Sequence, residues 1–214
     1  MSQRLSRLTA PLTGLLFVGL TLAGVAMSNN TPSSDASGAS VIAFYEAHRN
    51  SQRVSDILLV FASLFLVFFA GSLRGYLRRK PAAEAASALV PVGAALLAVG
   101  LTVVSGIDYA LADVPSHLGA GAAQALNVLD NDVFFTVLVG GGVFGIASAV
   151  AILRGATLPK WLGWVAVVLG IAMMTPAFWL AGIVLFVWVL IVSTLIYLRS
   201  GSTTATPTPA VAES

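Results

Sequence analysis

The chain of 214 residues contains no cysteine, which excludes disulfide bonds, thiolate metal sites and a cysteine nucleophile. Charged residues are also scarce, at 9% of the chain against roughly a quarter in ordinary soluble domains. So few charges leave too little polar surface to face water, which argues against a water-soluble globule. Hydrophobic residues instead reach 57% and the mean hydropathy is +0.92, a composition typical of a membrane protein.

Uncharged apolar runs recur along the chain, and a helix needs about 20 such residues to cross the hydrocarbon core. The run over residues 161–198 is too long for one crossing, so we expect a break near Thr175, Pro176 and Gly182. The sequence therefore predicts an all-α, polytopic membrane helix bundle with six transmembrane helices in one domain, residues 1–200. The expected spans are residues 10–27, 54–77, 86–107, 132–153, 161–177 and 181–199.

Both ends of the chain raise separate questions. Arg4 and Arg7 precede an apolar run that ends in small residues at 24–26, a pattern shared with cleavable signal peptides. We favour an uncleaved anchor. Cleavage would instead leave five spans and place the new N-terminus outside. Residues 201–214 are rich in Thr, Pro and Ala, so we predict a disordered cytoplasmic tail.

The segment between the first two spans is predicted to carry a short outer amphipathic helix. Apolar residues at positions 41, 42, 44 and 45 are followed by polar ones at 46, 48, 49 and 50. Asp35 is a suitable N-cap for this helix, because its carboxylate can accept from the first free backbone amides. Such a helix lies at the membrane surface or leads into the second span.

The basic residues indicate the orientation, because short loops rich in Lys and Arg remain cytoplasmic. With the N-terminus inside, nine of the eleven basic residues fall on the inner side: Arg4, Arg7, Arg74, Arg78, Arg79, Lys80, Arg154, Lys160 and Arg199. The sequence thus predicts a multi-pass protein of the cytoplasmic membrane with both termini cytoplasmic. These basic residues flank helix ends and face lipid headgroups, so no nucleic-acid partner is expected.

Several polar residues are predicted to gather at the outer ends of the spans, where charged groups are functional candidates. This candidate outer polar cluster comprises His48, Arg53, Asp56, Asp108, Asp130 and Asp132. Asp56 lies about one turn inside its span, and we expect Arg53 to hold it in an ion pair, since the two residues share a helix face. His48 and His117 lack metal-ligand spacing, so no metal site and no cofactor are predicted.

A stripe of small residues predicts close helix packing. Gly141, Gly145 and Ala149 recur every four residues in one span, and Ala166 with Gly170 repeats the spacing in the next. The glycine run at 140–142, which includes Gly141, lies inside a span and therefore does not form a phosphate-binding loop.

Several stretches of the chain together resemble a known family. They are Asp35, the pairs at 44–45, 48–49, 126–127 and 134–135, the stretch 71–74, and the run Leu-Pro-Lys-Trp-Leu-Gly-Trp at 158–164. The chain resembles a family of small multi-pass actinobacterial membrane proteins of unknown function, over about residues 10–199. The resemblance implies a multi-pass bacterial membrane protein and does not imply any particular activity.

Two functions from different classes fit the sequence. The first is a non-enzymatic accessory or scaffold protein, whose partners are the lipid bilayer and another membrane protein or a second copy of itself. The alternative is a small transporter or channel subunit with an acidic outer mouth. An enzyme is not predicted, because the sequence shows no catalytic constellation.

The orientation can be tested with topology reporters. We expect a cytoplasmic reporter to be active when fused after Ser200, and an external reporter to be active when inserted within residues 33–38. The reason is that basic residues keep the segments that carry them on the cytoplasmic side. An external C-terminus would contradict the orientation. A mature N-terminus at Met27 would instead favour the signal peptide.

Overall fold

The computed structural model describes residues 2–201, with side-chain environments given for residues 12–199, and this part of the chain is all-helical. The all-α prediction is therefore confirmed for these residues. The helices are α1 (Ser2–Met27), α2 (Gly38–Leu77), η1 (Pro81–Ala83), α3 (Glu84–Asp113), η2 (Pro115–His117), α4 (Ala120–Asp132), α5 (Phe135–Gly155), α6 (Lys160–Ala172) and α7 (Phe178–Gly201).

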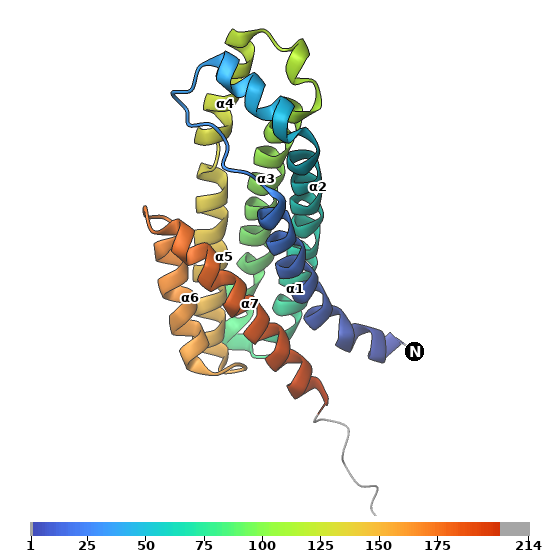
Figure 1. The fold of residues 1–214 in the computed structure, drawn as a ribbon. Helices are drawn as coiled ribbons and strands as arrows, with labels where there is room; N and C mark the ends of the chain where they lie inside the picture. Colours follow the sequence, from blue (N-terminus) through green and yellow to red (C-terminus); the bar gives the residue numbers. More distant parts are fainter. Residues whose placement is uncertain (1, 202–214) are drawn as a thin grey trace, which may run out of the picture.

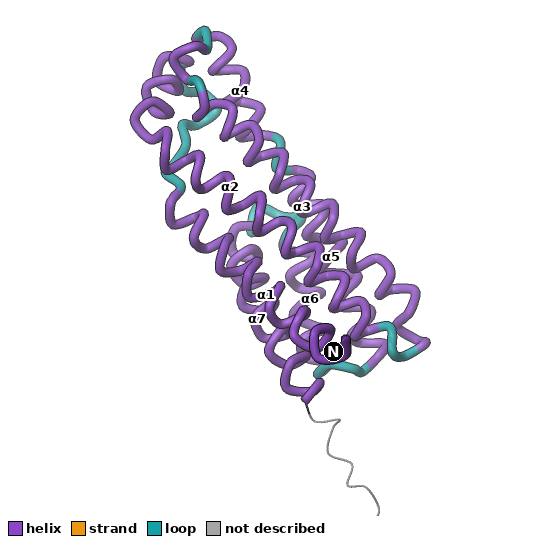
Figure 2. The backbone as a smooth tube through the Cα atoms, turned by 90° about the vertical axis from the view of Figure 1, so that its right-hand side faces the viewer, coloured by secondary structure: helices purple, strands orange, loops and turns teal. Residues whose placement is uncertain are grey.

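Six helices form a closed ring in which α1, α2, α3, α5, α6 and α7 each pack against the next and α7 returns to α1. Figure 1 shows α4 outside this ring, at the end of the elongated bundle where α2 begins. The start of α1 and the end of α7 lie together at the opposite end. Figure 2 shows the long helices running along the length of the bundle.

Four helical segments are long and apolar enough to cross a membrane, among the described residues. They are Gly38–Leu77, Pro81–Asp113, Ala120–Gly155 and Phe178–Arg199. Two further apolar helices, Leu12–Met27 and Lys160–Ala172, are shorter. The structure is thus a helical bundle with four candidate membrane spans.

The predicted short outer helix is not an element of its own, because its residues are the first turns of the continuous helix α2; of the two predicted arrangements, the structure shows the one that leads into the second span. The polar stretch over residues 48–53 contains neither Gly nor Pro, so nothing ends the helix before the apolar span begins. The N-cap is Ser37, whose hydroxyl accepts from the Ser40 amide at 3.2 Å. Asp35 instead accepts from the Ser33 hydroxyl, which lowers the pKa of this exposed carboxyl.

The structure places two other boundaries differently from the prediction. The expected span 132–153 begins only at Phe135, and an additional helix, α4, precedes it. The predicted break at Thr175 and Pro176 is present, but Gly182 lies within α7. The Thr175 hydroxyl donates to the Ala172 carbonyl at 2.8 Å and accepts from the Ala177 amide at 3.2 Å, which closes this turn. Of the predicted tail, Gly201 ends α7 and residues 202–214 lie outside the described residues.

Glycines on α5 bring it close to both of its neighbours in the ring. A Cβ atom at Gly145 would lie 2.7 Å from the Gly170 Cα atom and 3.1 Å from the Ala166 carbonyl oxygen, both on α6. A Cβ at Gly141 would collide with the Met173 side chain beyond the end of α6. The predicted small-residue stripe thus faces α6, and its third member, Ala149, is fully buried.

The opposite side of α5 makes a second close approach, to α3, that the stripe did not predict. A Cβ at Gly140 would collide with the backbone of Leu97, and one at Gly93 would collide with the backbone of Phe144. Successive residues of a helix point about 100° apart, so neighbouring glycines serve different helices. The Gly140–Gly142 run therefore allows α5 to fit between α3 and α6.

The contact between α5 and α6 should be sensitive to a larger side chain. We expect Gly145→Leu to lower the free energy of unfolding in detergent by about 1–3 kcal/mol or more, because backbone atoms of α6 block the new side chain. Thermal unfolding measures this.

Gly71→Leu on α2 is the matched control, since nothing lies within 4 Å of a Cβ at that position. Its stability should match that of the parent. Equal stability of Gly145→Leu and the parent would show that α5 and α6 do not pack as described.

Candidate functional site

The candidate site lies at the end of the bundle where α4 covers α2 and α3. On α2, Arg53 and Arg74 bracket an apolar stretch about 30 Å long at the rise of an α-helix, in which Asp56 is the one acidic or basic residue, and this length matches the hydrocarbon thickness. The first turns of α2, together with η2 and α4, therefore extend past the apolar region as a cap. We use "cap" below for residues 38–53 and 115–132.

Three predicted carboxyl groups meet where the cap joins the rest of the bundle. Asp56 of α2 is 3% exposed and Asp108 of α3 is 9% exposed. Asp130 of α4 is half-buried, and its Oδ1 atom is buried without a hydrogen-bond partner among the described residues. Asp130 interacts electrostatically with the other two. The structure thus brings together three of the four predicted aspartates, and we call Asp56, Asp108 and Asp130 the carboxyl cluster.

Asp108 is the centre of the carboxyl cluster. Its Oδ1 atom accepts from the Tyr45 hydroxyl, and its Oδ2 atom accepts from Gln52 Nε2 at 3.1 Å. The carboxyl groups of Asp56 and Asp108 also lie within hydrogen-bonding reach of each other. Tyr45 and Gln52 are both fully buried, so these donors are held in place by the surrounding helices.

The connection between α1 and α2, residues 28–37, is fixed to the cap by side-chain amides. We call this connection the strap. The backbone amide of Asn29 donates to Gln52 Oε1 at 2.8 Å, so Gln52 joins the strap to Asp108. Asn127 of α4 donates to the Ser33 carbonyl at 2.8 Å, and Asn131 donates to the Pro32 carbonyl at 3.2 Å. The strap is therefore tied to both α2 and α4.

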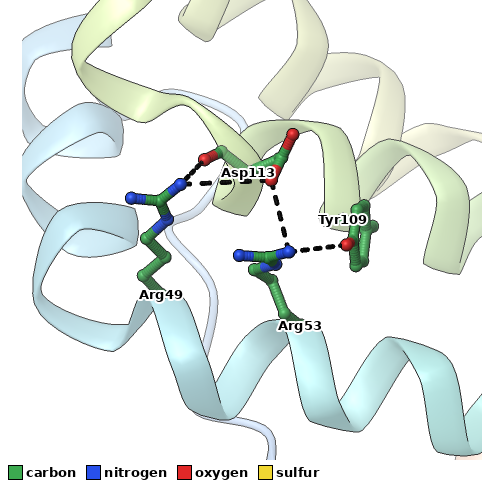
Figure 3. Close-up of polar contacts among 4 residues, drawn as sticks. All are labelled: Arg49, Arg53, Tyr109 and Asp113. Atoms are coloured by element: carbon green, nitrogen blue, oxygen red, sulfur yellow. Dashed lines mark hydrogen bonds and ion pairs between the residues drawn. The ribbon is translucent and has the colours of Figure 1, made fainter.

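The predicted ion pair between Arg53 and Asp56 is not formed. Arg53 instead donates to the Tyr109 hydroxyl at 2.8 Å and lies 3.5 Å from a carboxylate oxygen of Asp113. Figure 3 shows Arg49 reaching the same Asp113 from one turn earlier on α2. A long arginine side chain can extend toward water, whereas the short Asp56 side chain stays between the helices.

The remaining predicted residues lie outside the carboxyl cluster. His48 Nδ1 donates to the Phe44 carbonyl at 2.9 Å, and the His48 ring lies against the Phe44 ring. Asp132 is exposed at the end of α4, and His117 is exposed in η2. Among the described residues, no group of three or more His, Cys, Asp or Glu could hold a metal ion.

Tyr45, Gln52 and Asn127 were not predicted as site residues, although the sequence holds a signal for the first two. Tyr45, Gln52 and Asp56 are spaced by seven and four residues, so all three lie on one face of a helix. A polar stripe that continues into an apolar span indicates a partner on another helix. Asn127 carries no comparable signal, because α4 itself was not predicted.

A scan of family models, a search of curated proteins and a search of solved structures each found no match for this chain. The resemblance to a family of small actinobacterial membrane proteins therefore stays a prediction.

The Tyr45 hydroxyl should matter for stability because it donates to a buried acceptor. We expect Tyr45→Phe to lower the free energy of unfolding by about 1–3 kcal/mol, since Asp108 Oδ1 loses the Tyr45 donor. Denaturation in detergent measures the change.

Tyr109→Phe is the matched control. It also removes one hydroxyl, but at a half-buried contact with Arg53, where about 0–1 kcal/mol is expected. Equal losses in the two variants would show that Asp108 does not depend on Tyr45.

Proposed function

We propose that this chain is a non-enzymatic accessory or scaffold protein of the cytoplasmic membrane. The supporting observation is the apolar middle of the ring. Between Asp56 and Arg74 on α2, and at the matching levels of the other ring helices, the sequence has no Asp, Glu, Lys, Arg or His. A path for an ion or a polar solute needs polar groups along its whole length.

Large side chains fill the middle of the ring. Phe17 of α1, Phe69 of α2, Phe144 of α5 and Trp188 of α7 are each exposed by 2% or less. Phe144 and Trp188 pack edge to face with ring centroids 6.1 Å apart. This packing supports a structural role for the bundle, because aromatic contacts of this kind hold helices in a fixed arrangement.

The ring also supports six crossings. We propose that α1 and α6 cross together with the four longer segments, because both complete the ring. Burial of Phe17 and Val18 on α1 favours an uncleaved anchor. The start of α1 and the end of α7 lie at one end of the bundle, which fits an even number of crossings and two cytoplasmic termini. The exposed apolar side chains then face lipid, another membrane protein or a second copy.

The alternative function is a small transporter or channel subunit. The observation that favours it is the convergence of Asp56, Asp108 and Asp130, since buried acidic residues of membrane proteins often mark ion sites. The cluster would form an acidic mouth at the outer end. The two functions differ in whether ions can continue past it.

Reconstituted vesicles separate the two functions. We expect the purified chain to carry no Na⁺, K⁺, Ca²⁺ or H⁺ flux above that of empty vesicles, because the apolar middle offers no polar route. In gently solubilised native membranes, the chain should migrate in a complex larger than the purified chain alone. Flux in the parent that is lost in Asp56→Asn would support the transporter. Migration at the size of the purified chain would contradict the scaffold.

A further inference from the structure

The contact between Asp56 and Asp108 sets a chemical requirement. An ionised carboxylate only accepts hydrogen bonds, so two carboxyl groups can hydrogen-bond to each other only when one of them carries a proton. Asp56 Oδ2 is buried and receives no hydrogen bond from the described residues. The Tyr45 hydroxyl and the Gln52 side-chain amide both donate to Asp108, so neither serves Asp56 Oδ2. A proton held between the two carboxyl groups satisfies both residues.

The charged groups around the pair provide no alternative counter-ion. From α4, Asp130 faces the pair and adds a third carboxyl group, while Asp132 is exposed. From α2, Arg49 and Arg53 are directed to Asp113, Glu46 is exposed, and His48 lies against Phe44. Over residues 12–37 the one titratable side chain is Asp35, which is exposed. Within residues 12–199, no ion pair reaches the carboxyl cluster.

We propose that Asp56 and Asp108 form a proton-binding site that fastens the cap and the strap to the membrane bundle. The proton lies between the two carboxyl groups. Asp108 is linked to the strap by two hydrogen bonds, one from Gln52 to Asp108 and one from the Asn29 amide to Gln52. Asp130 faces the same pair from α4. The site therefore joins α2, α3, α4 and the strap at one point.

Removal of this proton places like charges next to each other. With Asp56 and Asp108 both ionised, and Asp130 near them, the repulsion acts in a buried region where charges are poorly screened. The least costly relief is separation of α4 and the strap from α2 and α3. Hydrogen bonds from Asn127 and Asn131 tie α4 and the strap to each other, whereas the bond between Asn29 and Gln52 and the small apolar group around Tyr45 hold them to α2 and α3. The cap is therefore held closed at low pH and released at high pH.

The pH dependence follows from proton linkage. The folded protein binds a proton that a solvated aspartate in the unfolded chain releases above about pH 4. Where the folded state binds more protons than the unfolded state, stability falls as the pH rises. The stability that the proton provides is present at acidic pH and is lost as the folded protein finally releases it.

Thermal unfolding in detergent between about pH 5 and about pH 9 tests the site. We expect the parent to lose several degrees of midpoint temperature across this range. Asp56→Asn should flatten this dependence and be more stable than the parent at high pH, because its amide donates to Asp108 without a proton. Asp113→Asn is the matched control, since it alters an exposed carboxylate, and it should keep the parent's dependence. A parent curve without pH dependence, or one unchanged in Asp56→Asn, would overturn the proposal.

Infrared spectroscopy tests the proton directly. We expect the parent at neutral pH to show the carbonyl stretch of a protonated carboxylic acid, and Asp56→Asn to lack it. Addition of Na⁺ or Ca²⁺ at constant pH should change neither this band nor the unfolding midpoint. Loss of the band with a rise in midpoint would show a metal-cation site and overturn the proposal.

Release of the cap can be followed at one position. The chain has no native cysteine, so Ala123→Cys introduces a single thiol on the buried face of α4, next to Val41 and Tyr45. At high pH this thiol should react with a maleimide several-fold faster in the parent background than in the Asp56→Asn background. Because both backgrounds are compared at the same pH, the effect of pH on the ionisation of the thiol itself is the same in each. Equal rates at high pH would show that the proton does not fasten the cap.

Discussion

The close approach of α5 to both α3 and α6 is the interaction on which the ring depends. In a bilayer, apolar surfaces gain little by leaving lipid for protein, so helices associate through dense packing and hydrogen bonds. Gly140 lets the backbone of α3 approach one side of α5, and Gly145 with Gly170 lets α6 approach the other. The remaining helices close the ring around this three-helix layer, and Phe144 from α5 fills its interior. Because α3 is fixed within this layer, Asp108 is also fixed at a defined position along the length of the bundle.

The membrane character and most of the helices could be predicted because each depends on local composition. A run of apolar residues specifies a helix in lipid whatever it packs against, and Gly145 with Gly170 follows a simple repeat. The continuity of α2 through residues 48–53 was missed because the polar residues were read as a boundary, although none of them stops a helix. Helix α4 was missed because its sequence is neither strongly apolar nor clearly periodic, and contacts with α2 and α3 stabilise it.

The candidate site was predicted in part for a similar reason. Asp56, Asp108 and Asp130 could be named because acidic residues are rare in or near apolar spans, and rarity is visible in one sequence. Their partners depend on the rotation of three helices, which the sequence does not specify. Arg53 shares a helix face with Asp56, yet the nearby Tyr109 and Asp113 of α3 offer it an exposed position. Asp56 is buried between the helices and contacts Asp108. Both residues are acidic, and no rule of charge pairing predicts such a contact.

A buried carboxyl pair weakens a fold unless its surroundings hold it, since burying polar groups without partners costs free energy. Here the donors Tyr45 and Gln52 are fully buried, and the strap fixes Gln52 from its other side. The proposed proton site and the proposed scaffold role are therefore coupled through the cap. A partner that binds the closed cap more tightly than the released cap must strengthen proton binding by the same factor, because coupling between two binding sites is reciprocal. The pH at the cap would then regulate which partners the bundle holds.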